Sequence, residues 1–121
     1  MPGCAGKLRF VLRRELTLGS KIAQAVHGAI AYALKYPADC VRWVLLSNTV
    51  VVLEAPGEEL DQLRLQLAHA DHRYAFFQEP DLNHQLTCLV LAPEPEMAIW
   101  TSKLPLAGRD AKVAQRQSRA L

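Results

Sequence analysis

The alternation of apolar and polar residues predicts where the strands of this chain lie. Residues 8–14, LRFVLRR, alternate apolar and arginine side chains, which is the period of a strand with one buried face. Residues 49–55, TVVVLEA, are apolar and rich in β-branched types, as in a central strand. Residues 74–78 and 86–92 predict two more strands. The first two strands should pair in parallel through a helical crossover, whereas the last two either pair antiparallel or lie apart.

Apolar residues three and four positions apart predict the helices. After a turn at residues 16–19, Ser20 can cap a first helix whose apolar residues share one side, and Pro37 limits its end. These apolar residues are Ile22, Val26, Ala29, Ile30, Ala33 and Leu34. Pro37 can also open a short second helix, and residues 56–70 predict a third with acidic residues in its first turn. This order of elements predicts a three-layer α/β/α sandwich with a four-stranded mixed sheet.

The composition predicts one soluble domain. The chain has 121 residues, half of them apolar, which suits a single core. We assign residues 7–107 to this domain and residues 108–121 to a basic, flexible tail. No apolar run approaches the roughly 20 residues that span a bilayer, and the opening MPGCAGK lacks the apolar segment of a signal peptide. We therefore expect a cytoplasmic protein with no membrane partner.

The three cysteines do not predict a metal site. Cys4, Cys40 and Cys88 are widely spaced and lack the paired spacing of a zinc or redox motif. Cys88 lies in an apolar run and should be part of the core. We predict reduced thiols, no metal and no cofactor.

Charge is distributed unevenly along the chain, although the net charge is only +2. The segment 7–42 carries +5, the segment 54–96 carries −7, and the segment 103–121 carries +4. This segregation suits an anionic partner on the surface that the first segment builds. A simply solvated charged surface explains the same pattern.

The first helix carries a candidate anion site at its start. Its polar face, opposite the apolar residues, holds Lys21, Gln24, Gly28 and Lys35, with His27 at the boundary. The free N–H groups near Ser20 and the charge of Lys21 suit a phosphate or a developing oxyanion. The alternative is structural: Lys21 is solvated, His27 packs at the boundary, and Gly28 only clears a neighbouring side chain.

A second candidate cluster lies between the last two strands. Glu79 and Asp81 flank Pro80 at a strand end, where polar loops of α/β folds often carry function. Thr87, which opens the last strand, can donate from its hydroxyl. An aspartate that forms a turn and a threonine that suits a strand explain these residues equally well.

Three segments together resemble the type 2 peptidyl-tRNA hydrolase family. They are RRELTLGSKIAQAVHGA, TVVVLEAPGEELDQL and EPDLNHQLTCLVLAP, in that order within residues 8–93. The resemblance implies an α/β fold, hydrolysis of the ester that joins a peptide to tRNA, no obligatory cofactor, and commonly a homodimer. Lys21, Gln24, His27, Asp81 and Thr87 match the family motifs.

Two departures from the family pattern affect the site. The turn GSK is shorter and lacks one cationic residue, for which Arg14 or Lys35 would substitute. The loop DLNHQ is also shorter and lacks the first threonine of the closing motif, so Asn83 or His84 would supply a hydrogen bond. These departures leave the predicted fold unchanged and bear on catalysis.

These residues suggest hydrolysis by an activated water molecule. Asp81 would orient and deprotonate the water, and Lys21, with helix N–H groups or the hydroxyl of Thr87, would stabilise the oxyanion. His27 and Gln24 would hold the loop or the substrate, and direct catalysis by His27 is the less favoured alternative.

Arginine and lysine side chains would contact tRNA phosphates without reading sequence. The candidates are Arg9, Arg13, Arg14 and Lys35. Two rival readings remain: an inactive tRNA- or protein-binding module on the same fold, and a hydrolase of another small ester or amide.

Overall fold

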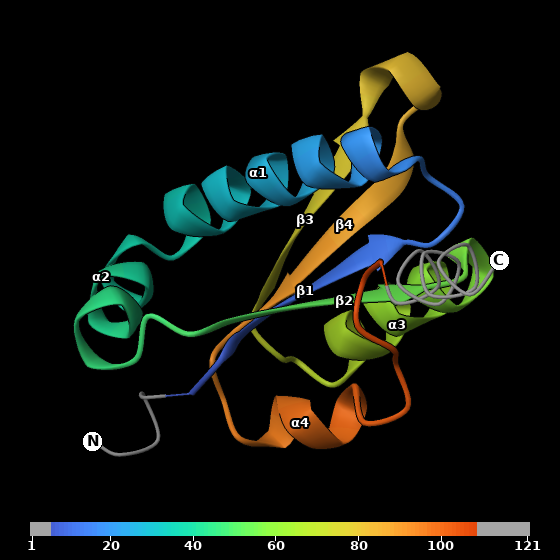
Figure 1. Ribbon diagram of the computed structural model, residues 1–121. Coiled ribbons are helices and arrows are strands. Elements are labelled where there is room, and N and C mark those ends of the chain that lie inside the picture. The colour runs from blue at the N-terminus through green and yellow to red at the C-terminus, as the bar shows by residue number, and fades with distance from the viewer. Residues whose placement is uncertain (1–5, 109–121) are drawn as a thin grey trace, which may run out of the picture.

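The computed structural model describes residues 6–108 (Figure 1). The strands are β1 (Leu8–Arg13), β2 (Val50–Ala55), β3 (Tyr74–Glu79) and β4 (Gln85–Leu91). The helices are α1 (Leu18–Lys35), α2 (Pro37–Leu46), α3 (Gly57–His69) and α4 (Glu96–Trp100), with a 3₁₀ helix, η2 (Pro80–Leu82), between β3 and β4. The sequence pattern did not predict α4. Apart from Gly108, the predicted basic tail lies outside the described residues.

The strands form one mixed sheet in the order β2-β1-β4-β3. β1 and β2 are parallel, with Leu8 opposite Val50 and Arg13 opposite Ala55, as expected for strands joined by a helical crossover. β4 pairs antiparallel with both β1 and β3, so the last two strands are direct neighbours. The predicted α/β fold with a four-stranded mixed sheet is confirmed.

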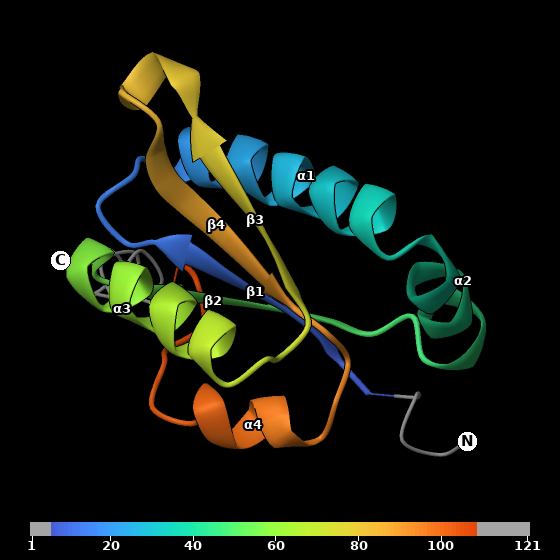
Figure 2. The same cartoon turned by 180° about the vertical axis from the view of Figure 1, so that it is seen from behind.

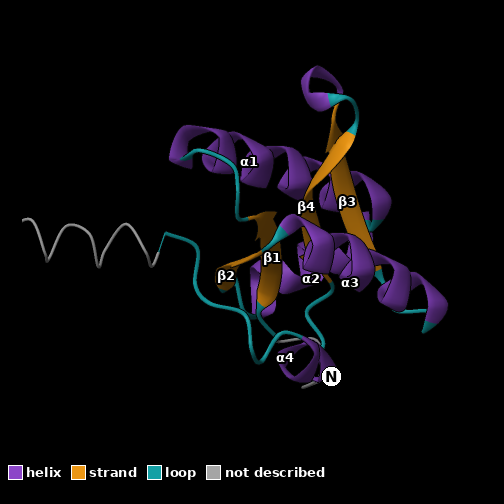
Figure 3. Ribbon diagram, turned by 90° about the vertical axis from the view of Figure 1, so that its right-hand side faces the viewer, coloured by secondary structure: helices purple, strands orange, loops and turns teal. Residues whose placement is uncertain are grey.

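Helices α1 and α3 lie on opposite sides of the sheet (Figure 2, Figure 3). Two apolar clusters pack the helices against it. One joins α1 and α2 to Phe10 and Leu12, and the other joins α3 and α4 to Val11. β1 contributes to both clusters because successive residues of a strand point to opposite sides. The prediction of one buried face for this strand was therefore wrong: β1 is central, and even Arg13 is buried.

Helix α1 begins and ends for local reasons. Thr17, not Ser20, is the N-cap: its Oγ1 accepts a hydrogen bond from the backbone N–H of Ser20 at 3.3 Å. The predicted cap was wrong because a hydroxyl three residues earlier already binds that N–H. The helix ends at Lys35, ahead of Pro37, which occupies the first turn of α2 as predicted.

The polar side of α1 faces the sheet. Its buried residues are Gln24, Gly28 and Tyr32, whereas the large aliphatic residues of the opposite side are exposed. Gly28 permits this close packing, because a Cβ there would lie 2.5 Å from Sγ of Cys88. The polar side of α1 is therefore packed against the sheet. Gly28 clears a neighbouring side chain, which was the structural alternative.

Candidate functional site

The topology gathers most of the predicted site residues at one edge of the sheet. β2 runs parallel to β1 and β4 runs antiparallel, so the ends of β1, β2 and β3 and the start of β4 share that edge. α1 also begins there, directly after the turn that follows β1 (Figure 1). We call this end of the sheet, where β1, β2 and β3 finish and β4 starts, the site edge. Polar groups at the carboxyl ends of strands often form the binding sites of α/β folds.

Lys21 forms an ion pair with Glu54 at the site edge. Lys21 Nζ lies 2.9 Å from Oε2 of Glu54, and the two side chains are 13% and 3% exposed. Arg14 Nε lies 3.7 Å from the other carboxylate oxygen, and the backbone N–H of Gly108 donates to Oε2 at 3.4 Å. A buried carboxylate requires such partners. The charge of Lys21 is therefore balanced within the chain.

Sequence reasoning missed Glu54, although a signal was present. It is the only charged residue in the segment 49–55, which is otherwise apolar apart from its first threonine. The prediction of a central strand was wrong, because β2 lies at the edge of the sheet. Its last three residues are nevertheless buried, so a carboxylate among them needs a cationic partner. Lys21, at the start of the preceding crossover helix, was a candidate for that partner.

A second polar group links α1 to the hairpin of β3 and β4. The hydroxyl of Thr87 donates to Oε1 of Gln24 at 2.8 Å, and Nε2 of Gln24 donates to Oε1 of Glu79 at 2.9 Å. Thr87 and Gln24 are both buried. The carbonyl of Phe77 lies 3.3 Å from the same hydroxyl. Thr87 thus has its acceptors inside the protein and is positioned to hold Gln24 rather than to donate to a substrate.

The tip of the hairpin carries Asp81 and Asn83, and both are exposed. Asp81 lies in η2 and makes no hydrogen bond or ion pair with any of residues 6–108. Asn83 and His84 both have left-handed backbone angles, with φ of 55° and 60°. The structure therefore places Asp81 on the site edge but does not bring it into contact with Lys21 or Thr87.

His27 and Lys35 lie farther along α1. The ring of His27 stacks on Phe77 of the edge strand, with centroids 4.3 Å apart and an interplanar angle of 11°. Lys35 is about 21 Å from Lys21 along the helix axis. Its Nζ donates to the carbonyl oxygen of Tyr74 at 2.9 Å. The structure thus does not bring Lys35 to the site edge, and it cannot replace the missing cation of the turn.

Arg13 lies beneath α3, not on an open surface. Its Nε donates to the carbonyl oxygen of Leu86 at 2.7 Å, and its Nη2 pairs with Asp61 at 3.0 Å. Two shallow hollows of about 390 and 480 Å³ meet at Arg13 and Gln85. Because Arg13 is buried and paired, it is not one of the exposed phosphate contacts that the sequence predicted. Arg14 remains the exposed cation at this edge.

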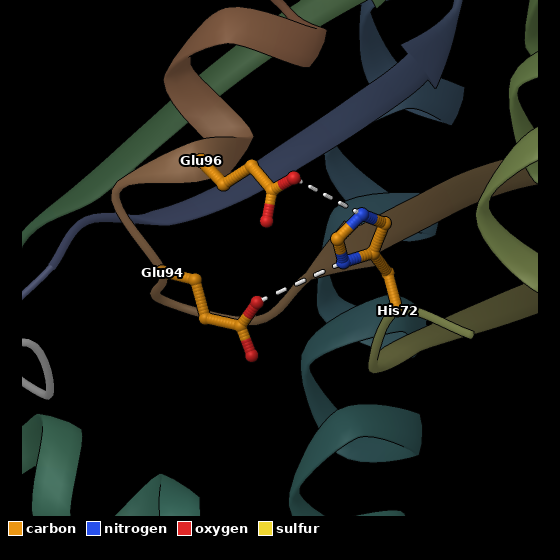
Figure 4. A group of neighbouring side chains, drawn as sticks. All are labelled: His72, Glu94 and Glu96. Carbon is orange, nitrogen blue, oxygen red and sulfur yellow. Dashed lines mark ion pairs between the residues drawn. The ribbon is translucent and has the colours of Figure 1, made fainter. Parts of the chain in front are cut away.

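The opposite edge of the sheet holds an ion-pair network (Figure 4). His72 Nδ1 lies 3.9 Å from Glu94, and its Nε2 lies 3.6 Å from Glu96. Arg73 binds the other oxygen of Glu94 at 2.7 and 3.0 Å and also pairs with Asp39. The network joins α2 to the start of α4 and therefore stabilises the packing of helices from the two apolar clusters.

The same three side chains have the donor types of a cation site. One nitrogen of His72 and one oxygen each of Glu94 and Glu96 lie within 4.8 Å of one another. Glu94 is nevertheless already bound by Arg73, and its hydrogen bonds raise the pKa of that guanidinium. Ion pairing within the chain accounts for this arrangement.

Burial makes the Cys88 thiol unreactive. Cys88 is fully buried under α1, and desolvation raises its pKa to about 12. The thiolate is the nucleophilic form of cysteine, so Cys88 is excluded as a nucleophile at neutral pH. Its predicted place in the core is confirmed.

Comparison with known proteins provides no functional assignment. No protein-family model matches the chain. A search of curated proteins also finds no match. Within residues 6–108, no helix has both the length and the apolar character needed to cross a bilayer.

Proposed function

We propose that this chain hydrolyses the ester bond between a peptide, or an N-blocked amino acid, and tRNA in the cytoplasm. Two features carry the proposal. One is the ion pair of Lys21 and Glu54, and the other is the neighbouring chain of hydrogen bonds from Thr87 through Gln24 to Glu79. Lys21 and Gln24 are three residues apart, so they are neighbours on one face of α1. The family resemblance of the surrounding motifs supports the same chemistry.

Lys21 is the proposed electrostatic catalyst. Its ammonium group has three N–H donors, and Glu54 is the acceptor that the described residues offer it. The remaining donors are free to stabilise the carbonyl oxygen of the ester as it becomes negative. Glu54 acts as a positioning residue, because it holds the ammonium group at the end of β2.

Asp81 is the proposed base for the attacking water. Its carboxylate is exposed and makes no hydrogen bond or ion pair among the described residues, so both oxygens can accept from water. The water adds to the ester carbonyl and passes a proton to Asp81. The bond from the carbonyl carbon to the ribose oxygen then breaks, and the proton returns to that oxygen, which leaves a free peptide and tRNA.

The remaining residues of the proposed site bind or position. Gln24 and Thr87 form the buried support behind Lys21, and His27 packs on Phe77 to fix α1 against the edge strand. Ser20, Asn83 and Arg14 are the groups proposed to contact the substrate. Arg14 would bind a phosphate, so affinity for tRNA should fall as the salt concentration rises.

Release of peptide from a purified N-blocked aminoacyl-tRNA tests the proposal. Lys21→Ala and Asp81→Asn should each lower single-turnover cleavage at least about 100-fold, the usual range for losing an oxyanion donor or a general base. Lys103→Ala and Glu59→Gln change exposed charges elsewhere and should leave the rate unchanged. Wild-type cleavage no faster than the uncatalysed rate would refute the hydrolase assignment.

A second candidate function is an inactive tRNA-binding module on the same fold. It is favoured by one observation: Glu54 already neutralises Lys21, and Asp81 does not touch that lysine. The peptide-release assay, together with a measurement of tRNA binding, separates the two functions. Salt-sensitive binding of tRNA without turnover would support the binding module.

A further inference from the structure

A hollow of about 390 Å³ lies between α3 and the hairpin of β3 and β4. Small-molecule sites usually have volumes of about 300 to 1,000 Å³. Its lining is mostly polar and comes from the end of β1, from α3 and from the hairpin. We call it the arginine hollow. The polar residues of its lining are Arg13, Asp61, Arg64, Gln78, His84 and Gln85.

Arg64 is a cation held in place without a hydrogen-bond acceptor. The central carbon of its guanidinium group lies 3.9 Å from the ring centroid of Phe76, so the group rests on the ring. Arg64 makes no hydrogen bond or ion pair with any of residues 6–108. The five N–H donors of a guanidinium group lie in its plane, so contact with a ring leaves them free to bind an anion.

Arg13 supplies a second guanidinium group. Its side chain is only 10% exposed, and two of its N–H donors are used: Nε donates to Leu86, and Nη2 donates to Asp61. The other three donors have no acceptor among the described residues. Arg13 is therefore not an exposed surface contact, but it is a buried cation with spare donors in the wall of the arginine hollow.

The remaining polar groups of the lining leave it with a positive charge. The side chains of Gln78 and Gln85 make no hydrogen bond with the described residues, so both amides can donate to a ligand. Asp61 is the one carboxylate in the lining, and the charge of Arg13 balances it. The charge of Arg64 is thus left without a counter-ion within the part of the chain that the structure describes.

We propose that the arginine hollow binds the phosphate group of a small phosphorylated metabolite. A phosphomonoester has three free oxygens and carries between about 1.5 and 2 negative charges at pH 7. Two guanidinium groups with unpaired donors match this charge and can bind the oxygens in pairs. A phosphodiester has only two free oxygens and one charge, so it is the poorer match. The volume of the hollow also fits a small molecule.

The proposal is independent of the hydrolase assignment. Arg64 lies on α3, and Arg13 lies beneath that helix. Lys21 lies on α1, on the other side of the sheet (Figure 3). Failure of the peptide-release assay would therefore leave the phosphate site untouched, and the reverse also holds.

NMR titration of the full chain with inorganic phosphate at constant ionic strength tests the site. The side-chain N–H signals of Arg13 and Arg64 should shift until they saturate. Arg64→Met keeps an unbranched side chain over Phe76 and should weaken binding at least about 10-fold, because charge-assisted hydrogen bonds are lost. Lys103→Met removes an exposed cation elsewhere and should have no effect. Shifts that do not saturate, or equal losses in both variants, would overturn the proposal.

Asp61→Asn provides a test of opposite sign. It removes the negative charge beside Arg13, while an amide oxygen can still accept from Nη2. Phosphate should then bind about 10-fold more tightly, because a repelling charge is gone. Lys21→Ala should leave phosphate binding unchanged, and circular dichroism checks that each variant is folded. Weaker binding by folded Asp61→Asn, or loss of binding by Lys21→Ala, would overturn the proposal.

The class of ligand is tested with two nucleotide probes. Adenosine 5′-monophosphate carries a phosphomonoester, whereas the dinucleotide ApA carries a phosphodiester between the same bases. The monophosphate should bind and lose at least about 10-fold in affinity in Arg64→Met. ApA should bind at least about 10-fold more weakly than the monophosphate, and adenosine alone should not bind. Equal or tighter binding of ApA would assign the hollow to a nucleic-acid backbone and overturn the proposal.

Discussion

Nζ of Lys21, in the first turns of α1, lies 2.9 Å from Oε2 of Glu54, near the end of β2. The two residues are 33 positions apart, and the crossover through α1 and α2 brings them together. Glu54 is almost fully buried, and the side chain of Lys21 is only 13% exposed. This pair supports the fold and is also the centre of the proposed catalytic site.

Removal of the Glu54 charge tests how much the pair stabilises the fold. Glu54→Gln keeps the side-chain volume but leaves Lys21 without its anionic partner. We expect the free energy of unfolding in urea to fall by about 3 kcal/mol, as for a largely buried pair that loses one charge. The double variant Lys21→Met/Glu54→Gln should recover part of this loss. Purely additive effects would mean that the two side chains are not coupled.

Gly28→Ala tests the close packing of α1 on β4. Alanine is the better helix former by about 1 kcal/mol, but its Cβ would lie 2.5 Å from Sγ of Cys88 and 3.0 Å from Val90. We expect the clash to prevail and thermal unfolding to show a net loss of about 1 to 2 kcal/mol. Adding Cys88→Ala removes the nearest atom and should restore stability. A stabilised single variant would contradict the packing described here.

Tyr32→Phe should stabilise the protein. The hydroxyl of Tyr32 is buried and has no hydrogen-bond partner among the described residues, and such a group costs about 1 to 3 kcal/mol. We expect urea unfolding at pH 7 to show a gain of about 1 kcal/mol. Tyr36→Phe is the matched control, because the Tyr36 hydroxyl donates to Tyr74 at 3.3 Å, and its loss should not stabilise.

The advantage of Tyr32→Phe should grow at alkaline pH. Burial raises the pKa of Tyr32 from 10 to about 12, so the folded state retains a proton that the unfolded chain releases. The stability that this residue contributes is complete below pH 10 and is lost as the pH rises towards 12. Unfolding measured at pH 8 and pH 11 should show a wider gap between variant and wild type at pH 11. A constant gap would contradict the raised pKa.

Thr87→Val tests the buried link between Thr87 and Gln24. Valine matches the shape of threonine but cannot donate to Oε1 of Gln24, whose buried oxygen then lacks a donor. The free energy of unfolding should fall by about 1 to 3 kcal/mol. Thr87→Ser keeps the hydroxyl, so it should retain the hydrogen bond and lose only the packing of one methyl group. Equal losses of stability in both variants would show that the hydrogen bond contributes nothing.

The sequence by itself determined the four strands, the first three helices and the fold class. Alternating and β-branched residues predict strands locally, and Pro37 ends a helix because it disfavours the helical conformation of the residue before it. Such effects act within a few residues of the chain, so they can be predicted without knowledge of the tertiary structure. The predicted order of strands and helices restricted the architecture to an α/β fold with a mixed sheet, which the structure confirms.

Only the tertiary structure decided which side of α1 is buried and which partner Lys21 has. An amphipathic pattern separates two sides of a helix but does not say which side meets the sheet. Gly28, in line with Gln24 and Tyr32, fits closely against β4, so the polar side is buried and the aliphatic side is exposed. The pairing of Lys21 with Glu54 likewise depends on adjacent parallel strands, because residues distant in sequence meet only when the sheet forms.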